Sequence, residues 1–232
     1  MSSFYLLNGW GLNESVLHPL QQKLTKRMPC TIVNLHDYHQ TSLALSLASL
    51  KQQIPVQSVV IGWSLGGMLA MQLAAIHPLK AVICLGSNPS FVSSSTWPVA
   101  MSQAQFTRFY QNTLTAPKRN LTNFLRLCIQ GEKQLRPLST AWLDTTLSHQ
   151  AQIEGLRLLQ SINNSSLLNE LVTPQLHVFA EYDALIPAQS HALLTQRHPH
   201  IPSYLLAAAS HAFPFSQTQL VFQLIDSFIQ PL

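Results

Sequence analysis

Charged side chains are scarce in this sequence. Only 9% of the 232 residues are Asp, Glu, Lys or Arg, whereas soluble domains carry about one quarter. The net charge of +4 reflects a shortage of acids, since 13 Lys and Arg face 9 Asp and Glu. Such dilute positive charge does not indicate a nucleic-acid-binding protein unless the basic residues cluster. The 47% of apolar residues supply a sizeable core, which argues against disorder.

Cysteines and long apolar runs are also few. Cys30, Cys84 and Cys128 lie far apart without CxxC spacing, so neither a disulfide framework nor a zinc site is predicted. No apolar run reaches the roughly 18 residues of a membrane span. Met1–Asn13 lacks the basic start, apolar stretch and cleavage site of a signal peptide. We therefore expect a cytoplasmic protein with reduced thiols and no contact with a membrane.

Short apolar runs alternate with segments of helical periodicity. Six runs are predicted to be buried strands: Phe4–Leu7, Thr31–Leu35, Val56–Ile61, Ala81–Leu85, Leu176–Ala180 and Tyr204–Ala208. Three intervening segments are predicted to be helices: Leu65–Ile76, Ala188–Arg197 and Gln219–Ile229. This alternation predicts one α/β domain over residues 1–232, with a mostly parallel sheet of about six strands flanked by helices.

The stretch from about residue 89 to residue 171 breaks this alternation. It contains no convincing strand, but three segments have helical character: Gln103–Leu114, Leu121–Ile129 and Thr140–Leu159. We interpret the stretch as a helical lid inserted between two sheet strands. The alternative is a set of connecting helices with no role at a site.

Gly62-Trp63-Ser64-Leu65-Gly66 lies between an apolar run and a helical segment. A Gly-x-Ser-x-Gly sequence between a strand and a helix is typical of a nucleophile elbow, the strained turn that exposes a reactive serine in the α/β-hydrolase fold. Glycines flank the serine because side chains there would collide with neighbouring backbone. The alternative is a tight turn with an idle serine. We expect Ser64 to be the nucleophile.

The other two members of a catalytic triad are expected downstream, at the ends of later strands. Asp183 follows the predicted strand Leu176–Ala180, and His211 follows Tyr204–Ala208. His211 would take the serine proton, and Asp183 would hold the imidazole. Glu181 is the nearest rival carboxylate, and Asp183 could instead cap a helix.

An oxyanion hole in this fold uses two backbone amides. We expect these donors to be Leu65, directly after the nucleophile, and Trp10, in the loop after the first strand. The Trp10 side chain would then be free to line the acyl pocket. It could instead shield the core.

Four segments together resemble one known family. They are Leu6-Leu7-Asn8-Gly9-Trp10-Gly11-Leu12-Asn13, Gly62-Trp63-Ser64-Leu65-Gly66-Gly67, Tyr182-Asp183-Ala184-Leu185-Ile186-Pro187 and Ser210-His211-Ala212-Phe213-Pro214-Phe215. This pattern resembles the pimeloyl-acyl-carrier-protein methyl ester esterases of biotin synthesis. The resemblance implies hydrolysis of a methyl ester on a carrier-bound pimeloyl chain. Two departures are Asn8, where the family usually has His, and a first core strand that the family precedes with further strands.

An acyl carrier protein is strongly acidic and would seek a basic surface. Six basic residues face one acid, Glu132, between residues 101 and 136: Arg108, Lys118, Arg119, Arg126, Lys133 and Arg136. The resemblance implies that Arg119 and Arg136 contact the carrier protein and that Phe124 lines the acyl channel. The alternatives are a solvated helix face for the arginines and an ordinary lid-core residue for Phe124.

Other functions stay open at this point. The fold also suits a general short-chain carboxylesterase, a C–C hydrolase or lyase, or a non-catalytic binding scaffold. His36, Asp37 and His39 lie in one loop, but no further ligands with zinc-like spacing accompany them. We expect a monomeric serine esterase without metal or cofactor.

Overall fold

The computed structural model describes residues 2–33 and 42–232. The described strands form one sheet in the order β2-β1-β3-β4-β5-β6, and each neighbouring pair is parallel. Their bounds are β1 Phe4–Leu7, β2 Cys30–Val33, β3 Val59–Trp63, β4 Ala81–Leu85, β5 Gln175–Ala180 and β6 Ser203–Leu206. The predicted parallel α/β sheet is therefore confirmed.

Burial explains why the central strands read as continuous apolar runs. All residues of β3, β4 and β5 are buried, because helices cover both faces of a parallel sheet. The edge strands β2 and β6 are partly exposed. The predicted run Tyr204–Ala208 begins one residue after the start of β6 and ends two residues beyond it, whereas the predicted run Thr31–Leu35 extends past the described residues.

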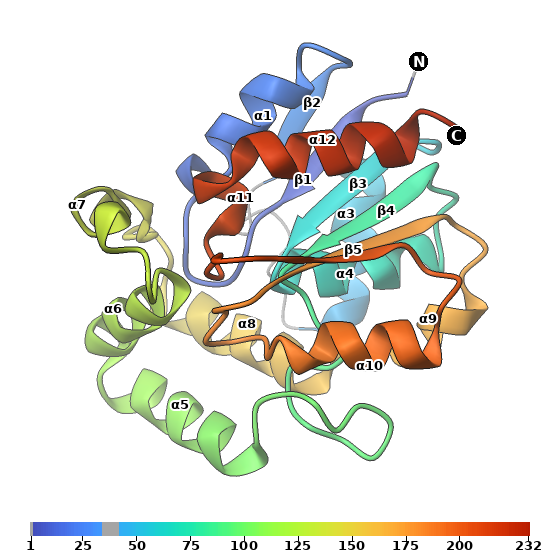
Figure 1. Cartoon of the computed structure of the whole chain (residues 1–232). Coiled ribbons are helices and arrows are strands. Elements are labelled where there is room, and N and C mark those ends of the chain that lie inside the picture. Colours follow the sequence, from blue (N-terminus) through green and yellow to red (C-terminus); the bar gives the residue numbers. More distant parts are fainter. Residues whose placement is uncertain (1, 34–41) are drawn as a thin grey trace.

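Helices pack on both faces of the sheet (Figure 1). The helices α1 (His18–Leu24) and α12 (Thr218–Ile229) contact each other in front of the sheet, where the short helices η1 (Glu14–Val16) and α11 (Phe213–Ser216) adjoin α1. Behind it lie α3 (Leu43–Gln53) and α4 (Leu65–Ala74), and α10 (Gln189–Arg197) packs on β5 and β6. Within the described ranges, none of the helices has the length and apolar character to cross a bilayer.

Residues 86–174, between β4 and β5, contain a series of helices that we call the helical insertion. Its elements are α5 Gln103–Thr115, α6 Pro117–Cys128, η2 Lys133–Leu135, α7 Arg136–Ser139, η3 Thr140–Trp142, α8 His149–Ser161 and α9 Leu167–Glu170. Figure 1 shows α5, α6, α7 and α8 gathered to one side of the sheet. The insertion contains no strand longer than an isolated bridge among its described residues.

The last predicted helix of the insertion differs from the structure in its first turns. Helical character was expected from residue 140, but α8 begins only at His149. Leu143 adopts an extended conformation, and the Asp144 side chain accepts hydrogen bonds from the backbone amides of Thr146 and Leu147. This turn competes with the helix, and Ser148 then caps α8.

A buried histidine in β5 makes stability depend on pH. His177 is 1% exposed and stacks on Phe179. Burial lowers the pKa of His177 from 6.5 to about 4, with a smaller contribution from the nearby His198. The unfolded chain therefore binds this proton first as the pH falls. Stability should decrease from pH 6.5 towards pH 4, by up to about 3 kcal/mol.

Urea unfolding at several pH values measures this effect. His177→Gln should flatten the loss of unfolding free energy between pH 6.5 and pH 4 relative to the parent protein. His18 is exposed, and His18→Gln serves as the control that is expected to keep the parent slope. An unchanged slope in the His177 variant would contradict the assignment.

Candidate active site

Ser64 lies at the sharp turn between β3 and α4. Its backbone has φ +56° and ψ −121°, a conformation that L-residues rarely adopt and that stores strain. A methyl group on Gly62 would lie 2.2 Å from the carbonyl oxygen of Gly66. The turn therefore requires glycine at this position, as the Gly-x-Ser-x-Gly pattern predicts. Leu65 begins α4, so its amide belongs to the positive end of a helix.

Asp183 and His211 form a buried pair. The Nδ1 of His211 lies 2.6 Å from the Oδ2 of Asp183, and both side chains are 0% exposed. The other carboxylate oxygen, Oδ1, accepts hydrogen bonds from the amides of Leu185 at 2.8 Å and Ile186 at 2.9 Å. These two amides orient the carboxylate towards the imidazole. Glu181 is exposed and accepts instead from the amide of Ala208.

The imidazole lies against the elbow. The indole of Trp63, directly before Ser64, donates a hydrogen bond to the carbonyl oxygen of His211 at 3.0 Å, and the two ring centroids are 5.3 Å apart. The amide of Ser64 donates to Leu85 at 2.9 Å, and a methyl group on Gly86 would lie 3.3 Å from the Nδ1 of His211. Among the described residues, the buried Nε2 of His211 has no hydrogen-bond partner. This nitrogen can therefore accept a proton.

The loop after β1 passes beside the serine. A methyl group on Gly9 would lie 3.1 Å from the Cβ of Ser64, so the backbone approaches the elbow closely. The side-chain amide of Asn8 donates to the carbonyl oxygen of Leu12 at 2.7 Å. Asn8, which replaces the histidine usual in the resembling family, thus closes this loop upon itself. The next amide along the loop is that of Trp10.

The Trp10 side chain connects this loop to the helical insertion. It is 0% exposed, and its Nε1 donates to the carbonyl oxygen of Gln152 in α8 at 2.8 Å. Its ring lies edge-on to Phe109 of α5 and Phe124 of α6, with centroid distances of 5.3 Å and 4.9 Å. Trp10 is therefore a packed contact between the sheet and three insertion helices.

Comparison with known proteins agrees with this architecture. Residues 18–218 match the family model of the alpha/beta hydrolase fold. An esterase from Exiguobacterium antarcticum superposes with a TM-score of 0.81 at 15% identity, over 99% of this chain and 92% of that one. MenH from S. aureus superposes with a TM-score of 0.77 at 17% identity, over 99% and 94% of the two chains. These structural likenesses show the fold.

Curated sequences narrow the family. The pimeloyl-[acyl-carrier protein] methyl ester esterase of Aeromonas hydrophila is 32% identical over 239 residues, which cover 97% of this chain and 94% of that protein. The chain belongs to this esterase family of α/β hydrolases. The biotin biosynthesis bifunctional protein of Cellvibrio japonicus is 33% identical over 98% of this chain. Since the match covers 47% of that protein, the chain spans about half of its length.

This member of the esterase family has a cavity of mixed character next to the Asp183 loop. The cavity of about 320 Å³ has apolar and polar lining residues: Met101, Phe109, Phe124, Leu127, Ala184 and Leu185 are apolar, and Gln105, Arg108, Asn112, Asn120 and Asn123 are polar. That volume lies at the lower end of the range for small-molecule sites. Phe124, 2% exposed, thus lines a cavity and also packs on Trp10. Ser64 is 4% exposed, so this serine is nearly closed from solvent.

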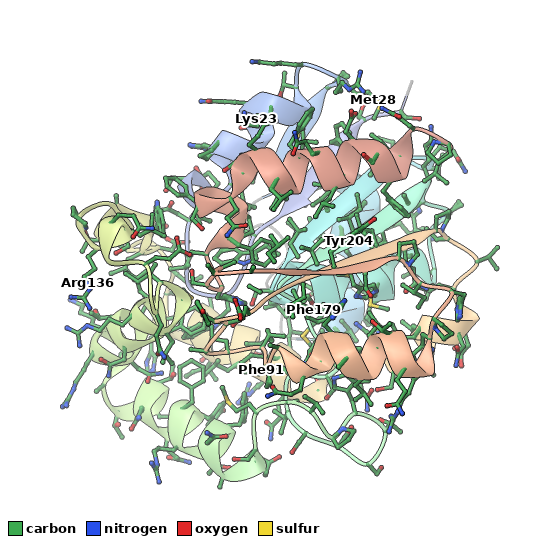
Figure 2. All side chains as sticks on the ribbon, in the orientation of Figure 1. Lys23, Met28, Phe91, Arg136, Phe179 and Tyr204 are labelled. Carbon is green, nitrogen blue, oxygen red and sulfur yellow. The ribbon has the colours of Figure 1, made fainter. Side chains whose placement is uncertain are left out.

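The two arginines implied by the family resemblance lie on the insertion. Arg119 is exposed on α6, and Arg136 is exposed at the start of α7. Figure 2 shows the Arg136 side chain at the outer side of the insertion, pointing away from the sheet. Arg136 and Arg126 also line a larger cavity of about 650 Å³.

Sequence reasoning missed several contacts at this site. Glu132 was noted only as the lone acid among basic residues, yet its carboxylate is buried against the loop that carries His211. The bonds from Trp63 to His211 and from Trp10 to Gln152 were also unforeseen. Each joins residues more than 140 positions apart. No local signal in the sequence reports such pairs.

Two further groups of residues were considered in the sequence: the loop with His36, Asp37 and His39, and the three cysteines. His36, Asp37 and His39 lie outside the described residues. Cys30, Cys84 and Cys128 are free thiols, and burial raises the pKa of Cys30 and of Cys84 to about 12. Burial, and secondarily the charge of Asp183, raises the pKa of Cys128 well above its ordinary value. These thiols remain protonated and poorly nucleophilic.

Proposed function

We propose that this chain is a serine carboxylesterase that hydrolyses the methyl ester of a pimeloyl chain carried by acyl carrier protein. The observation that supports it best is the 2.6 Å contact between Asp183 and His211, buried beside the strained elbow of Ser64. A carboxylate that accepts two backbone amides on one oxygen is oriented for an imidazole on the other. Family membership supports the substrate.

In the proposed acylation step, the Oγ of Ser64 attacks the ester carbonyl carbon. The Nε2 of His211 takes the hydroxyl proton, and the Asp183 carboxylate stabilises the imidazolium. The amides of Leu65 and Trp10 stabilise the oxyanion. Collapse of the intermediate breaks the bond between the carbonyl carbon and the methoxy oxygen. Methanol leaves with the proton from His211, and the acyl group stays on Ser64.

In the proposed deacylation step, a water molecule attacks the carbonyl carbon of the acyl group on Ser64. His211 takes a proton from this water as its oxygen adds to the acyl carbon, and then gives the proton to the Oγ of Ser64 as the bond between that oxygen and the acyl carbon breaks. The products are a free carboxyl group and the resting serine. We propose that the cavity beside Phe124 and Leu185 receives part of the substrate, with methylene groups against its apolar side chains and polar groups near Arg108. Because Ser64 is nearly closed from solvent, we propose that the helical insertion acts as a lid.

Purified protein tests this function directly. We expect turnover of short p-nitrophenyl esters and a higher kcat/KM for methyl pimeloyl-carrier protein than for free dimethyl pimelate. Equal values for the two methyl esters would favour a general carboxylesterase. A fluorophosphonate probe should label Ser64, whereas a binding scaffold would not acquire the adduct.

The basic face of the insertion should matter only for the carrier-bound substrate. Arg119→Glu combined with Arg136→Glu reverses two exposed charges that would face an acidic carrier protein. We expect kcat/KM for the carrier-bound ester to fall by about 10-fold to 100-fold at low salt, and this loss to shrink as salt rises. The kcat/KM for p-nitrophenyl butyrate should stay within about 2-fold.

A charge-matched control separates docking from net charge. Lys26 and Lys51 are exposed. They precede β2 and β3 in the chain, whereas Ser64 follows the carboxyl end of β3. Lys26→Glu with Lys51→Glu should leave the carrier-bound kcat/KM nearly unchanged. If this pair lowers kcat/KM as much as the arginine pair does, the insertion is not the docking face.

A further inference from the structure

A carboxylate of the helical insertion is buried against the loop after β6. Glu132 lies between α6 and η2 and is 7% exposed. Its Oε1 accepts hydrogen bonds from the Ser210 amide at 3.1 Å, from the Ser210 hydroxyl, and from the Ser216 hydroxyl at 3.0 Å. Gln134 donates to the other oxygen at 3.3 Å. A buried charge is costly without such donors, so this geometry specifically suits a carboxylate.

The donors to Glu132 belong to the segment that holds His211. The Ser210 hydroxyl donates to Glu132 and accepts from the Ala212 amide at 3.1 Å. The Ala212 amide also lies 3.0 Å from the carbonyl oxygen of Cys128, at the end of α6. The residues on both sides of His211 are therefore bonded to the insertion, while Trp63 binds the His211 carbonyl from the sheet.

We propose that Glu132 is a positioning residue for His211. By binding Ser210, it fixes the backbone from which the imidazole contacts Asp183 and, in the proposed reaction, takes the proton of Ser64. This proposal rests on the proposed esterase function, because it assigns Glu132 a role through the base of that reaction. Glu132 does not touch the reacting atoms. Its contribution is to keep the Nε2 of His211 in line with the serine hydroxyl.

The chemistry predicts how substitutions rank. Alanine at position 132 removes the acceptor and leaves the Ser210 amide and hydroxyl and the Ser216 hydroxyl to find other partners. Glutamine keeps a carbonyl oxygen that can accept from Ser210 but loses the charge that strengthens these bonds. Ser210→Ala removes the hydroxyl that connects Glu132 with Ala212. The expected order of activity is parent, then Glu132→Gln, then Glu132→Ala.

Steady-state kinetics with p-nitrophenyl butyrate tests the proposal. Small displacements of a reacting group cost about 10-fold to 100-fold in rate, so we expect Glu132→Ala to lower kcat by that factor with KM within about 2-fold. The rate of fluorophosphonate labelling should fall in parallel. Glu132→Gln should recover most of kcat. Adding Ser210→Ala to Glu132→Ala should cost little more, because the two residues act through one contact.

A second buried acid of the insertion provides the matched control. Glu154 in α8 is 6% exposed and pairs with Arg157 at 2.9 Å, away from the His211 loop. Glu154→Ala should lower thermal stability and leave kcat near the parent value. A Glu132→Ala protein with parent kcat and a lowered melting temperature would overturn the proposal. If alanine prevents folding, parent kcat in both Glu132→Gln and Ser210→Ala overturns it instead.

Failure of the proposed function gives a different result. In that case neither the parent protein nor the Glu132 variants hydrolyse esters or become labelled at Ser64. Failure of the positioning role leaves the parent active and the Glu132 variants equally active.

Discussion

Ser64→Ala is expected to lower kcat for p-nitrophenyl butyrate by at least about 10⁴-fold. The substitution removes the only atom through which the proposed acyl-enzyme can form. The fold should persist, because alanine is smaller than serine and the turn already depends on Gly62. Burst kinetics and fluorophosphonate labelling measure the same loss independently. Both signals should vanish in the variant.

Ser58 offers a control on the same part of the chain. It is buried just before β3, at the end of that strand opposite Ser64. Ser58→Ala should hydrolyse and label like the parent protein. Retention of parent activity by Ser64→Ala would exclude the serine mechanism and leave the elbow without an assigned role.

Asp183→Asn is the second large effect. The Oδ1 of Asp183 accepts from the amides of Leu185 and Ile186, so the asparagine oxygen will occupy that position. Its NH₂ group must then face the Nδ1 of His211. Two donors cannot share this contact, and the imidazole is driven to the tautomer with its proton on Nε2. That nitrogen can no longer take the proton of Ser64, and kcat should fall about 10⁴-fold.

The rival carboxylate tests the specificity of this result. Glu181 precedes Asp183 by two residues but is exposed and binds the Ala208 amide. Glu181→Gln should keep kcat within about 2-fold of the parent. A larger loss in Glu181→Gln than in Asp183→Asn would reassign the acid. Circular dichroism of both variants would exclude unfolding as the cause.

Much of the fold was predictable because the sheet is parallel and buried. The apolar runs Phe4–Leu7 and Ala81–Leu85 coincide with β1 and β4, since both are bounded by polar or turn-forming residues. The bounds fit less well at β3, predicted from Val56, because Val56 is exposed and Gln57 takes a positive φ. The helices α1 and α3 were not predicted. The helix α1 packs on α12, which lies at the other end of the chain, and α3 packs on α4, which follows only after β3. Such distant partners leave no local signal in the sequence.

The positions of the candidate site residues were predictable where these residues directly follow the carboxyl ends of strands. Ser64, Asp183 and His211 each follow a strand, and the parallel sheet brings those ends to one edge. The contacts of Glu132 with Ser210 were not predictable, because the two residues are 78 positions apart and no periodicity joins them. The structure describes where the site residues lie, but their roles stay predictions: Ser64, Asp183 and His211 in catalysis, the amides of Trp10 and Leu65 at the oxyanion, and Arg119, Arg136 and Phe124 in substrate binding.

The indole of Trp10 connects the loop after β1 to helices of the insertion, which lie outside the sheet. The sheet is held by its own ladder and buried strands, whereas the insertion contributes aromatic contacts and the Gln152 carbonyl. The buried side chains of the two parts nevertheless form one cluster, in which Trp10 and Phe124 pack with residues of the sheet. Loosening of the insertion would therefore also release the loop after β1, so we expect activity to depend on the packing of helices that lie outside the sheet.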